Sequence, residues 1–157
     1  MVGSILGNRV PRTEDVNLLT AGGTYVYDLP FDNVAHAYFV RSTVAHATIK
    51  EINIDEAIKA PGVIGVITAD ELGMDPINPG LQMVSDTFAR TPLATDTVRY
   101  VGDPVVVIVA ETFQQAVDAA ELVYIDYDYL PTIVDAEAAL DEHTDPIFPA
   151  QGNNVAF

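Results

Sequence analysis

The longest apolar run in the chain lies at residues 105–110, and the other hydrophobic and polar positions are arranged around it. Its residues are Val-Val-Val-Ile-Val-Ala, and a Gly-Asp-Pro turn at 102–104 leads into it. A short continuous run of β-branched residues is typical of a strand that is buried on both faces. The pattern therefore predicts a central strand that the other elements cover.

The clearest helical pattern follows this strand at 112–122. Thr112 and Gln115 have the spacing of a capping box, and apolar residues recur at helical intervals from 113 to 120. Shorter helices are predicted at 56–60, at 69–72 and at 136–140. Asp55 and Asp135 stand where their carboxylates can accept the free amides of the first turn of the helix that follows.

Alternating or β-rich segments predict further strands at 35–42, 47–54, 63–68 and 123–129. Ile49 is out of step with Ile52, which predicts a bulge near 50–51. The order strand–helix–strand occurs at 47–68 and again at 104–129, which predicts two βαβ-like units. The fold class is therefore α+β (mixed α/β), with a few short helices and one longer helix near 112–122.

Three parts of the chain differ in pattern. Residues 1–24 show no sustained period and are predicted to form an N-terminal extended segment, 25–140 the folded domain, and 141–157 a C-terminal exit linker. Within the domain, 73–96 is a long irregular loop that carries apolar residues, namely Leu81, Met83, Val84 and Phe88. These side chains either fold back as a flap or pack on something outside this chain, and the sequence leaves both open.

Composition narrows the possible partners. Seven basic residues stand against 23 acidic ones, for a net charge of −16, which argues strongly against nucleic acid and also against an anionic membrane surface as partners. Arg99 is the last Lys or Arg in the sequence, so the charged side chains among the 58 residues after it are all acidic. This half is a solvated acidic surface or a face that steers a basic partner. There is no cysteine, no apolar run of ~18 residues that could span a membrane, and no secretory signal pattern, so the predicted location is cytoplasmic.

Candidate chemistry is sparse. Asp126 and Asp128 lie two apart on one predicted strand face, where paired carboxylates could act as acid and base or hold a cation, but solvated acids explain them more simply. The other candidates lack the neighbours that their chemistry needs: the single histidines His36, His46 and His143, the serines Ser4, Ser42 and Ser85, and the glycine turn at 21–24. No catalytic, cofactor-binding or metal-binding residue is predicted.

Several segments occur together in a characteristic order: Gly-Asn-Arg-Val-Pro-Arg-Thr-Glu-Asp at 7–15, Phe-Val-Arg-Ser-Thr-Val-Ala-His-Ala at 39–47, Ala-Pro-Gly-Val at 60–63, Val-Arg-Tyr-Val-Gly-Asp-Pro-Val at 98–105 and Leu-Pro at 130–131. The ordered set resembles the N-terminal α/β-hammerhead domain of the molybdenum-binding large subunit of the xanthine dehydrogenase / aldehyde oxidase / carbon monoxide dehydrogenase family. In that family Gln is usual where Asp103 stands, and this departure is the first to examine.

The resemblance implies an α/β-hammerhead with mixed sheets and a parent oxidoreductase that hydroxylates aldehydes, xanthine or aromatic heterocycles, or oxidises carbon monoxide. It implies a molybdenum-pterin cofactor in the parent, with iron–sulfur and FAD groups on partner subunits or domains. In such enzymes the pterin site and the glutamate base lie in the domains that follow. The expected role is therefore a non-catalytic structural or assembly domain without a cofactor of its own, whose partners are the molybdopterin-binding domain of the same subunit and the iron–sulfur and flavin subunits.

Two alternatives accompany this hypothesis. The chain is either an excised fragment of a large subunit or one subunit of a split enzyme. It could instead be a free-standing binding module that reuses the hammerhead fold, with the 73–96 loop as a lid.

Overall fold

The computed structural model describes residues 7, 12–23 and 25–156, in two units, Met1–Asn33 and Val34–Phe157. The first unit contains helix α1 (Asp15–Thr20) and the single 3-10 turn η1 (Val26–Asp28). The sequence predicted an extended segment here, and α1 is a correction to it. Asp15 accepts a hydrogen bond from the amide of Arg12 (3.3 Å) and pairs with its guanidinium (3.2 Å). Local contacts therefore support this helix, none of whose residues is buried, and no apolar period is needed.

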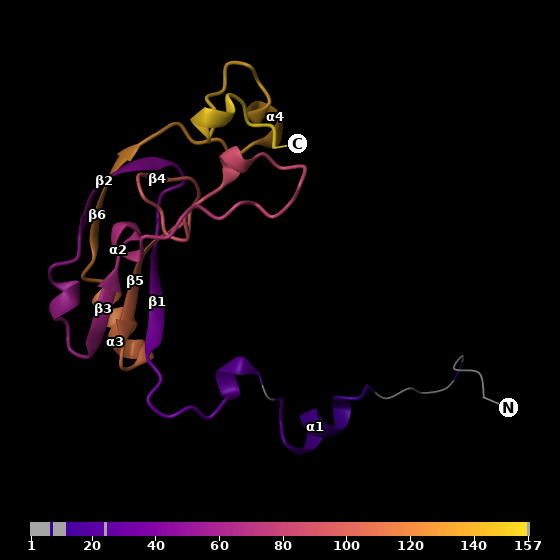
Figure 1. Cartoon of the computed structure of the whole chain (residues 1–157), viewed down its shortest axis with the longest axis vertical. Helices are drawn as coiled ribbons and strands as arrows, with labels where there is room; N and C mark the ends of the chain where they lie inside the picture. Colours follow the sequence, from indigo (N-terminus) through magenta and orange to yellow (C-terminus); the bar gives the residue numbers. More distant parts are fainter. Residues whose placement is uncertain (1–6, 8–11, 24, 157) are drawn as a thin grey trace. The chain divides into compact units, whose positions relative to one another are not determined.

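The second unit is built on two three-stranded sheets (Figure 1). One sheet has the order β1-β5-β3, from His36–Arg41, Pro104–Ala110 and Val63–Ile67. The other has the order β4-β2-β6, from Thr97–Val98, Ala47–Asn53 and Tyr124–Tyr129. The strand pairs of the described residues are all antiparallel, so the sheets are antiparallel and not mixed.

The two predicted βαβ-like units are wrong. In both segments the two strands belong to different sheets: β2 and β3 are separated, as are β5 and β6. A 3-10 turn in the first segment and a helix in the second join one sheet to the other instead of crossing over within a single sheet. Hydrophobic periodicity shows that a segment is a strand, but it does not show which strand it pairs with.

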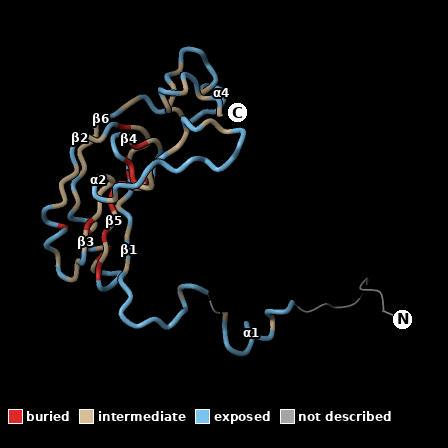
Figure 2. The backbone as a smooth tube through the Cα atoms, viewed as in Figure 1, coloured by how far each residue is buried: buried red, intermediate tan, exposed pale blue. Residues whose placement is uncertain are grey.

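Strand β5 is the centre of the core, as predicted. It lies between β1 and β3, and its neighbouring residues Val105 and Val106 are both fully buried. Because successive side chains on a strand point to opposite faces, both faces are covered at this end. Figure 2 shows the buried positions gathered along β5 and the turn before it.

Helix α3 (Phe113–Ala120) packs on β1 and β5. Its predicted capping box is confirmed: the Thr112 hydroxyl accepts from the Gln115 amide (3.3 Å), and the Gln115 side chain accepts from the Thr112 amide (3.1 Å). Ala116 and Ala119 are fully buried, so the small side chains of this face let the helix approach the sheet closely.

The short elements agree with the sequence in part. The bulge in β2 is confirmed by a register shift between Ile49 and Glu51, and helix α2 forms at Ala69–Leu72. The Asp135 cap is confirmed: its Oδ1 accepts from the amides at 137 and 138 at the start of α4 (Ala136–Ala139).

The Asp55 cap is wrong. The segment after it forms only the 3-10 turn η2 (Ala57–Lys59), and its cap residue Glu56 makes no side-chain capping hydrogen bond. The Asp55 amide instead donates to Asn53 Oδ1 (3.1 Å). This local Asx-type turn competes with helix initiation at Asp55.

The irregular loop 73–96 and the segment 141–156 lie side by side, in pink and yellow in Figure 1. The loop contains η3 (Asp86–Phe88) and the segment contains η4 (Pro149–Gln151). The rings of Phe88 and Phe148 meet edge to face at 5.0 Å between centroids, and the Thr87 hydroxyl donates to Gln151 Oε1. The loop therefore folds back over part of its length.

The fold-back leaves part of the loop uncovered. Val84 and Phe88 are half-buried, whereas Leu81 and Met83 are 63% and 70% exposed. Folding back thus accounts for Val84 and Phe88, and packing of Leu81 and Met83 on something outside this chain stays a prediction.

Candidate functional site

The paired carboxylates of β6 do not form a site with a third ligand. Asp128 is exposed and pairs with Lys50 across the sheet (3.6 Å). Asp126 is half-buried opposite Glu51, and not fully solvated as the sequence predicted. Among the described residues no three His, Cys, Asp or Glu side chains come together.

The other sequence candidates are dispersed. His36 lies on β1, the Nδ1 atom of His46 contacts the carbonyl of Pro131 (2.8 Å), and His143 lies beside Glu142. The Ser42 hydroxyl donates to the carbonyl of Val44, and the Ser85 hydroxyl accepts from the Thr87 amide. Ser4 and Thr24 lie outside the described residues. That no residue of this chain is catalytic stays a prediction.

The structure brings together a different group, which we call the arginine–aromatic cleft: Arg90, Arg99, Tyr100, Asp103 and Phe148. These residues line a cavity of about 660 Å³. They come from the end of the 73–96 loop, the turn between β4 and β5, and the C-terminal segment. The cleft lies wholly within the second unit.

Each guanidinium of the cleft stacks on an aromatic ring. The Arg99 guanidinium carbon lies 4.8 Å from the centroid of Phe148, and that of Arg90 lies 5.2 Å from the centroid of Tyr100. Arg99 Nη1 donates to the carbonyl of Thr97 (3.2 Å), while its buried Nε has no hydrogen-bond partner among the described residues. Stacking holds both groups in position and leaves N–H donors available.

Asp103 anchors the turn that carries Arg99 and faces Arg90 of the loop. Its side chain is buried, and its Oδ2 accepts a hydrogen bond from the Arg99 amide (3.0 Å). Its Oδ1 lies 4.0 Å from Arg90 Nη1, at the outer limit of an ion pair. Its backbone carbonyl accepts from the Ser42 amide (2.8 Å), which ties the turn to the end of β1. The sequence marked Asp103 as unusual but assigned it no role.

The charge of Asp103 also acts on Tyr127 of β6. Burial raises the pKa of the Tyr127 hydroxyl, the nearby Ser42 hydroxyl lowers it, and the negative charge of Asp103 raises it further, for a net rise. The Ser42 hydroxyl donates to the Val44 carbonyl, and the Tyr127 hydroxyl has no hydrogen-bond partner among the described residues. Tyr127 therefore stays neutral well beyond physiological pH.

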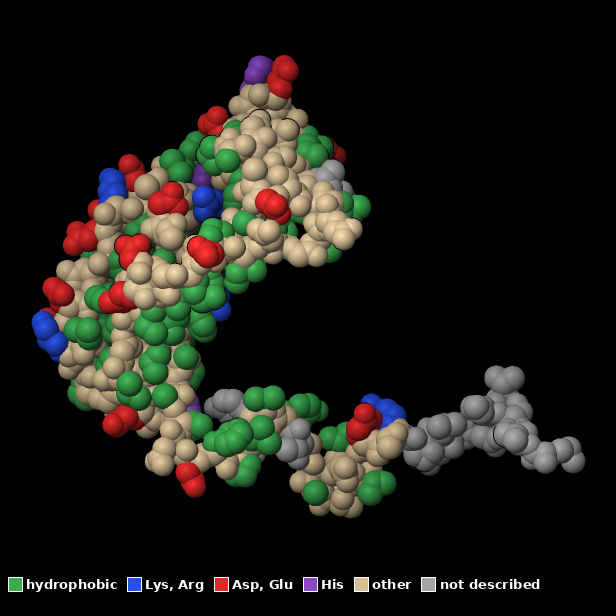
Figure 3. Space-filling view, in the orientation of Figure 1, with side chains coloured by type: hydrophobic (Ala, Val, Ile, Leu, Met, Phe, Trp, Pro, Cys, Tyr) green, Lys and Arg blue, Asp and Glu red, His purple; other side chains and the backbone are tan. Residues whose placement is uncertain are grey.

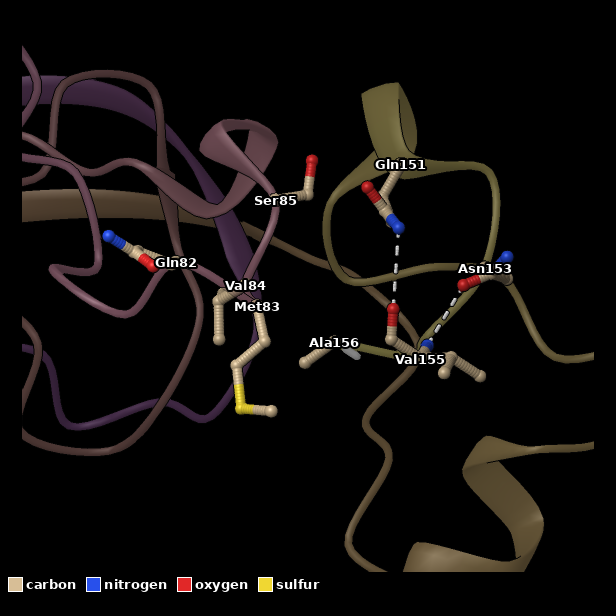
Figure 4. Close-up of a pocket in the computed structure, with 8 residues that line it drawn as sticks. All are labelled: Gln82, Met83, Val84, Ser85, Gln151, Asn153, Val155 and Ala156. Carbon is tan, nitrogen blue, oxygen red and sulfur yellow. Dashed lines mark hydrogen bonds between the residues drawn. The ribbon is translucent and has the colours of Figure 1, made fainter.

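A second cavity, of about 380 Å³, separates the loop from the end of the described chain (Figure 4). Met83 and Val84 line one side of it, and Val155 and Ala156 line the other. The far side is held in place by hydrogen bonds from Gln151 Nε2 to the Val155 carbonyl (3.3 Å) and from the Val155 amide to the side chain of Asn153 (2.9 Å).

The donors of the cleft do not fit a molybdenum ion. A guanidinium has only N–H donors and no lone pair for a metal, and the one buried carboxylate, Asp103, already accepts from Arg99. The described residues therefore supply no ligand set for the metal that the family resemblance implies for the parent. What the cleft can do chemically is bind a carboxylate or another small anion.

The sequence did contain a signal for this cleft. Arg90 and Arg99 are two of only seven basic residues, and no Lys or Arg follows Arg99. Two arginines next to an acidic C-terminal part of the chain are a candidate anion site. Their aromatic partner Phe148, however, lies 49 residues beyond Arg99, a contact that no local pattern predicts.

Residues 20–131 match the family model described as "Aldehyde oxidase and xanthine dehydrogenase, a/b hammerhead domain". Relatives of known name are much longer than this chain. The 6-hydroxypseudooxynicotine dehydrogenase complex subunit gamma of Paenarthrobacter nicotinovorans is 41% identical over 162 residues, which is 96% of this chain and 20% of the relative. The carbon monoxide dehydrogenase large chain of Afipia carboxidovorans is 35% identical over 87% of this chain and 17% of its own length.

The xanthine dehydrogenase molybdenum-binding subunit of Escherichia coli O157:H7 is 33% identical over 87% of this chain and 19% of its own length. Among solved structures, the aldehyde oxidoreductase from Desulfovibrio gigas superposes with a TM-score of 0.83 and 31% identity, over 94% of this chain and 17% of that one. The chain thus spans about a fifth of the length of the relatives that it matches.

Proposed function

Because the chain belongs to the α/β-hammerhead domain family of aldehyde oxidases and xanthine dehydrogenases, we propose that it is a non-catalytic assembly domain of a molybdenum hydroxylase large subunit. The observation that carries the proposal is the match of nearly the whole chain to one part of much longer relatives, one of them named a molybdenum-binding subunit. In this role the domain folds around β5 and offers its loops to the rest of the subunit.

The proposed parent is an oxidoreductase that hydroxylates an aldehyde, xanthine or an aromatic heterocycle, or oxidises carbon monoxide. Its molybdenum-pterin would be bound by the remaining part of the large subunit, and iron–sulfur and flavin groups by partner subunits or domains. This chain's own residues contribute packing and docking. A cytoplasmic location is part of the proposal and rests on the sequence alone. Among the described residues no helix could cross a membrane.

Elemental analysis tests the proposal directly. The purified 157-residue chain should contain no stoichiometric molybdenum and should oxidise none of the parent's substrate classes. The reading frame should continue into the molybdenum-binding remainder of a large subunit, or a neighbouring gene should encode that remainder. The chain and the remainder should form a complex when they are produced separately. Stoichiometric molybdenum in the isolated chain would overturn the proposal.

A second candidate function is a free-standing binding module, which the 660 Å³ arginine–aromatic cleft favours. Under this alternative the cleft binds a small anionic ligand and the 73–96 loop acts as a lid. Gene context separates the two functions, because a free-standing module requires no large-subunit gene nearby.

A further inference from the structure

Two segments of the second unit have almost no core of their own. In the stretches 73–92 and 130–156 no residue is buried, whereas strands β2 to β5, the turn η2, residues 93–94 and helix α3 hold twelve buried apolar residues. The two stretches nevertheless carry exposed large side chains, including Leu81, Met83 and Val134, the last of which is 91% exposed. Apolar groups that fold back without becoming buried are typical of a surface that a partner covers.

The arginine–aromatic cleft is lined partly by residues of these two segments, and its charge differs from that of the chain as a whole. Figure 3 shows acidic side chains widely spread over the second unit and few Lys or Arg side chains among them. Arg90 and Arg99 both line the cleft, and Asp103 balances only one of them. The cleft therefore keeps one net positive charge within an acidic surface.

The geometry selects the group that would bind there. A single net positive charge and two guanidinium forks stacked on rings suit one planar carboxylate better than a doubly charged phosphate. The wall beside the arginines is apolar, formed by Ile77, Phe88 and Ile147. An acidic side chain flanked by apolar ones matches both parts of the lining.

We propose that the arginine–aromatic cleft is a docking surface for the remaining part of the same large subunit, which inserts a carboxylate between Arg90 and Arg99 and covers the apolar wall. This inference rests on the proposed function, since that function supplies the partner. The chain spans only about a fifth of the length of its relatives, which supplies this occupant, and charge argues against a second copy of the chain. Two copies would each bring a net charge of −16 to the contact.

The test measures binding between the 157-residue chain and the separately produced remainder of its large subunit, by isothermal titration calorimetry. Arg99→Gln and Arg90→Gln should each raise Kd about tenfold or more, because each removes one side of a partly desolvated charge pair. Arg99→Lys should fall between Arg99→Gln and the wild type, since a lysine keeps the charge but loses the fork. Lys59→Gln removes an exposed charge that pairs with Glu56 and should bind as the wild type does.

The outcomes separate the two proposals. If the wild-type chain does not bind the remainder, the proposed function fails and this inference fails with it. If the wild type binds but folded Arg99→Gln and Arg90→Gln bind equally tightly, only the docking surface is overturned. Thermal unfolding of each variant shows that it is folded. Sedimentation that reveals a dimer of the chain, lost in Arg99→Gln, would make a second copy the occupant and overturn the proposal.

Discussion

At the scale of single residues, Asp103 is where separate parts of the second unit meet. One carboxylate oxygen fixes the turn that begins at Arg99, the other faces Arg90 of the irregular loop, and the backbone contacts Ser42 after β1. A buried carboxylate is tolerated because backbone and side-chain donors face it. Its loss should therefore be felt both in stability and in the position of the arginines.

Asp103→Ala should lower the free energy of unfolding by about 1.5–3 kcal/mol, because it removes a buried charged acceptor and leaves the Arg99 amide without its partner. Asp103→Asn keeps an acceptor oxygen and should cost less. The exposed control Asp128→Ala, which breaks only a surface ion pair, should cost about 0–1 kcal/mol. Urea denaturation measures all three, and equal costs for Asp103→Ala and Asp128→Ala would contradict the anchoring role.

The stability of the second unit should depend on pH in the alkaline range because of Tyr127. Burial raises the pKa of its hydroxyl above the ordinary value of about 10, so above that pH the folded chain holds a proton that the unfolded chain releases. The free energy of unfolding is therefore unaffected by this group below about pH 10 and falls as the pH rises from there through the folded pKa.

Tyr127→Phe should be close to neutral at pH 7, because the hydroxyl has no partner, and should lose less stability than the wild type above about pH 10. Tyr129→Phe, which removes an exposed hydroxyl from the same strand, should follow the wild type. Chemical denaturation at a series of pH values is the measurement. Parallel curves for Tyr127→Phe and the wild type would show that burial of this hydroxyl has no such effect.

At the scale of elements, the sequence predicted most strands and α3 because their signals are local. The capping box at Thr112, the alternation in β1 and the bulge in β2 each depend on residues within a few positions of one another. Helix α1 and strand β4 lacked such a signal. Helix α1 buries nothing, and β4 is only two residues long and exists as a strand because it pairs with β2.

Gly62 lies against the side chain that caps helix α3, although the two are far apart in the sequence. Its φ is +76°, and an added Cβ would lie 2.2 Å from the side-chain amide of Gln115, the residue that closes the capping box of α3. Gly62→Ala should therefore cost about 1–3 kcal/mol through backbone strain, together with displacement of that side chain. Gly65→Ala is the matched control, because no atom lies within 4 Å of its added Cβ and its φ is not positive.

Thermal or urea unfolding of the two glycine variants decides the point. Gly65→Ala should be neutral or slightly stabilising, since alanine narrows the unfolded ensemble. A Gly62→Ala variant as stable as Gly65→Ala would mean that the loop and Gln115 shift without cost.

At the scale of the whole molecule, the second unit combines a buried double-sheet core with loops that bury nothing. Antiparallel pairing joins β5 to β1 and β3 over long sequence separations, whereas 73–92 and 141–156 hold together through a few contacts such as Phe88–Phe148. Local stability should follow this division, because opening is easiest where buried apolar contacts are few.

Hydrogen exchange of the isolated chain should show amides of β5 protected about a hundredfold or more above those of 73–92 and 141–156. Addition of the remainder of the large subunit should slow exchange in these two segments and leave β5 little changed. The backbone of α3 is the internal control, since it packs on the sheet away from the cleft residues. Loops protected as strongly as β5 in the free chain would contradict this description.

The sequence by itself determined the strands, the main helix and its cap, the charge balance and the family, because each depends on local periodicity, on composition or on an ordered set of segments. It also identified Asp103 as unusual. Only the tertiary structure decided that β2 and β6 share one sheet while β5 belongs to the other, and that Phe148 stacks on Arg99. The physical reason is that pairing and stacking join groups far apart along the chain, and hydrophobic alternation is the same whichever partner a strand chooses.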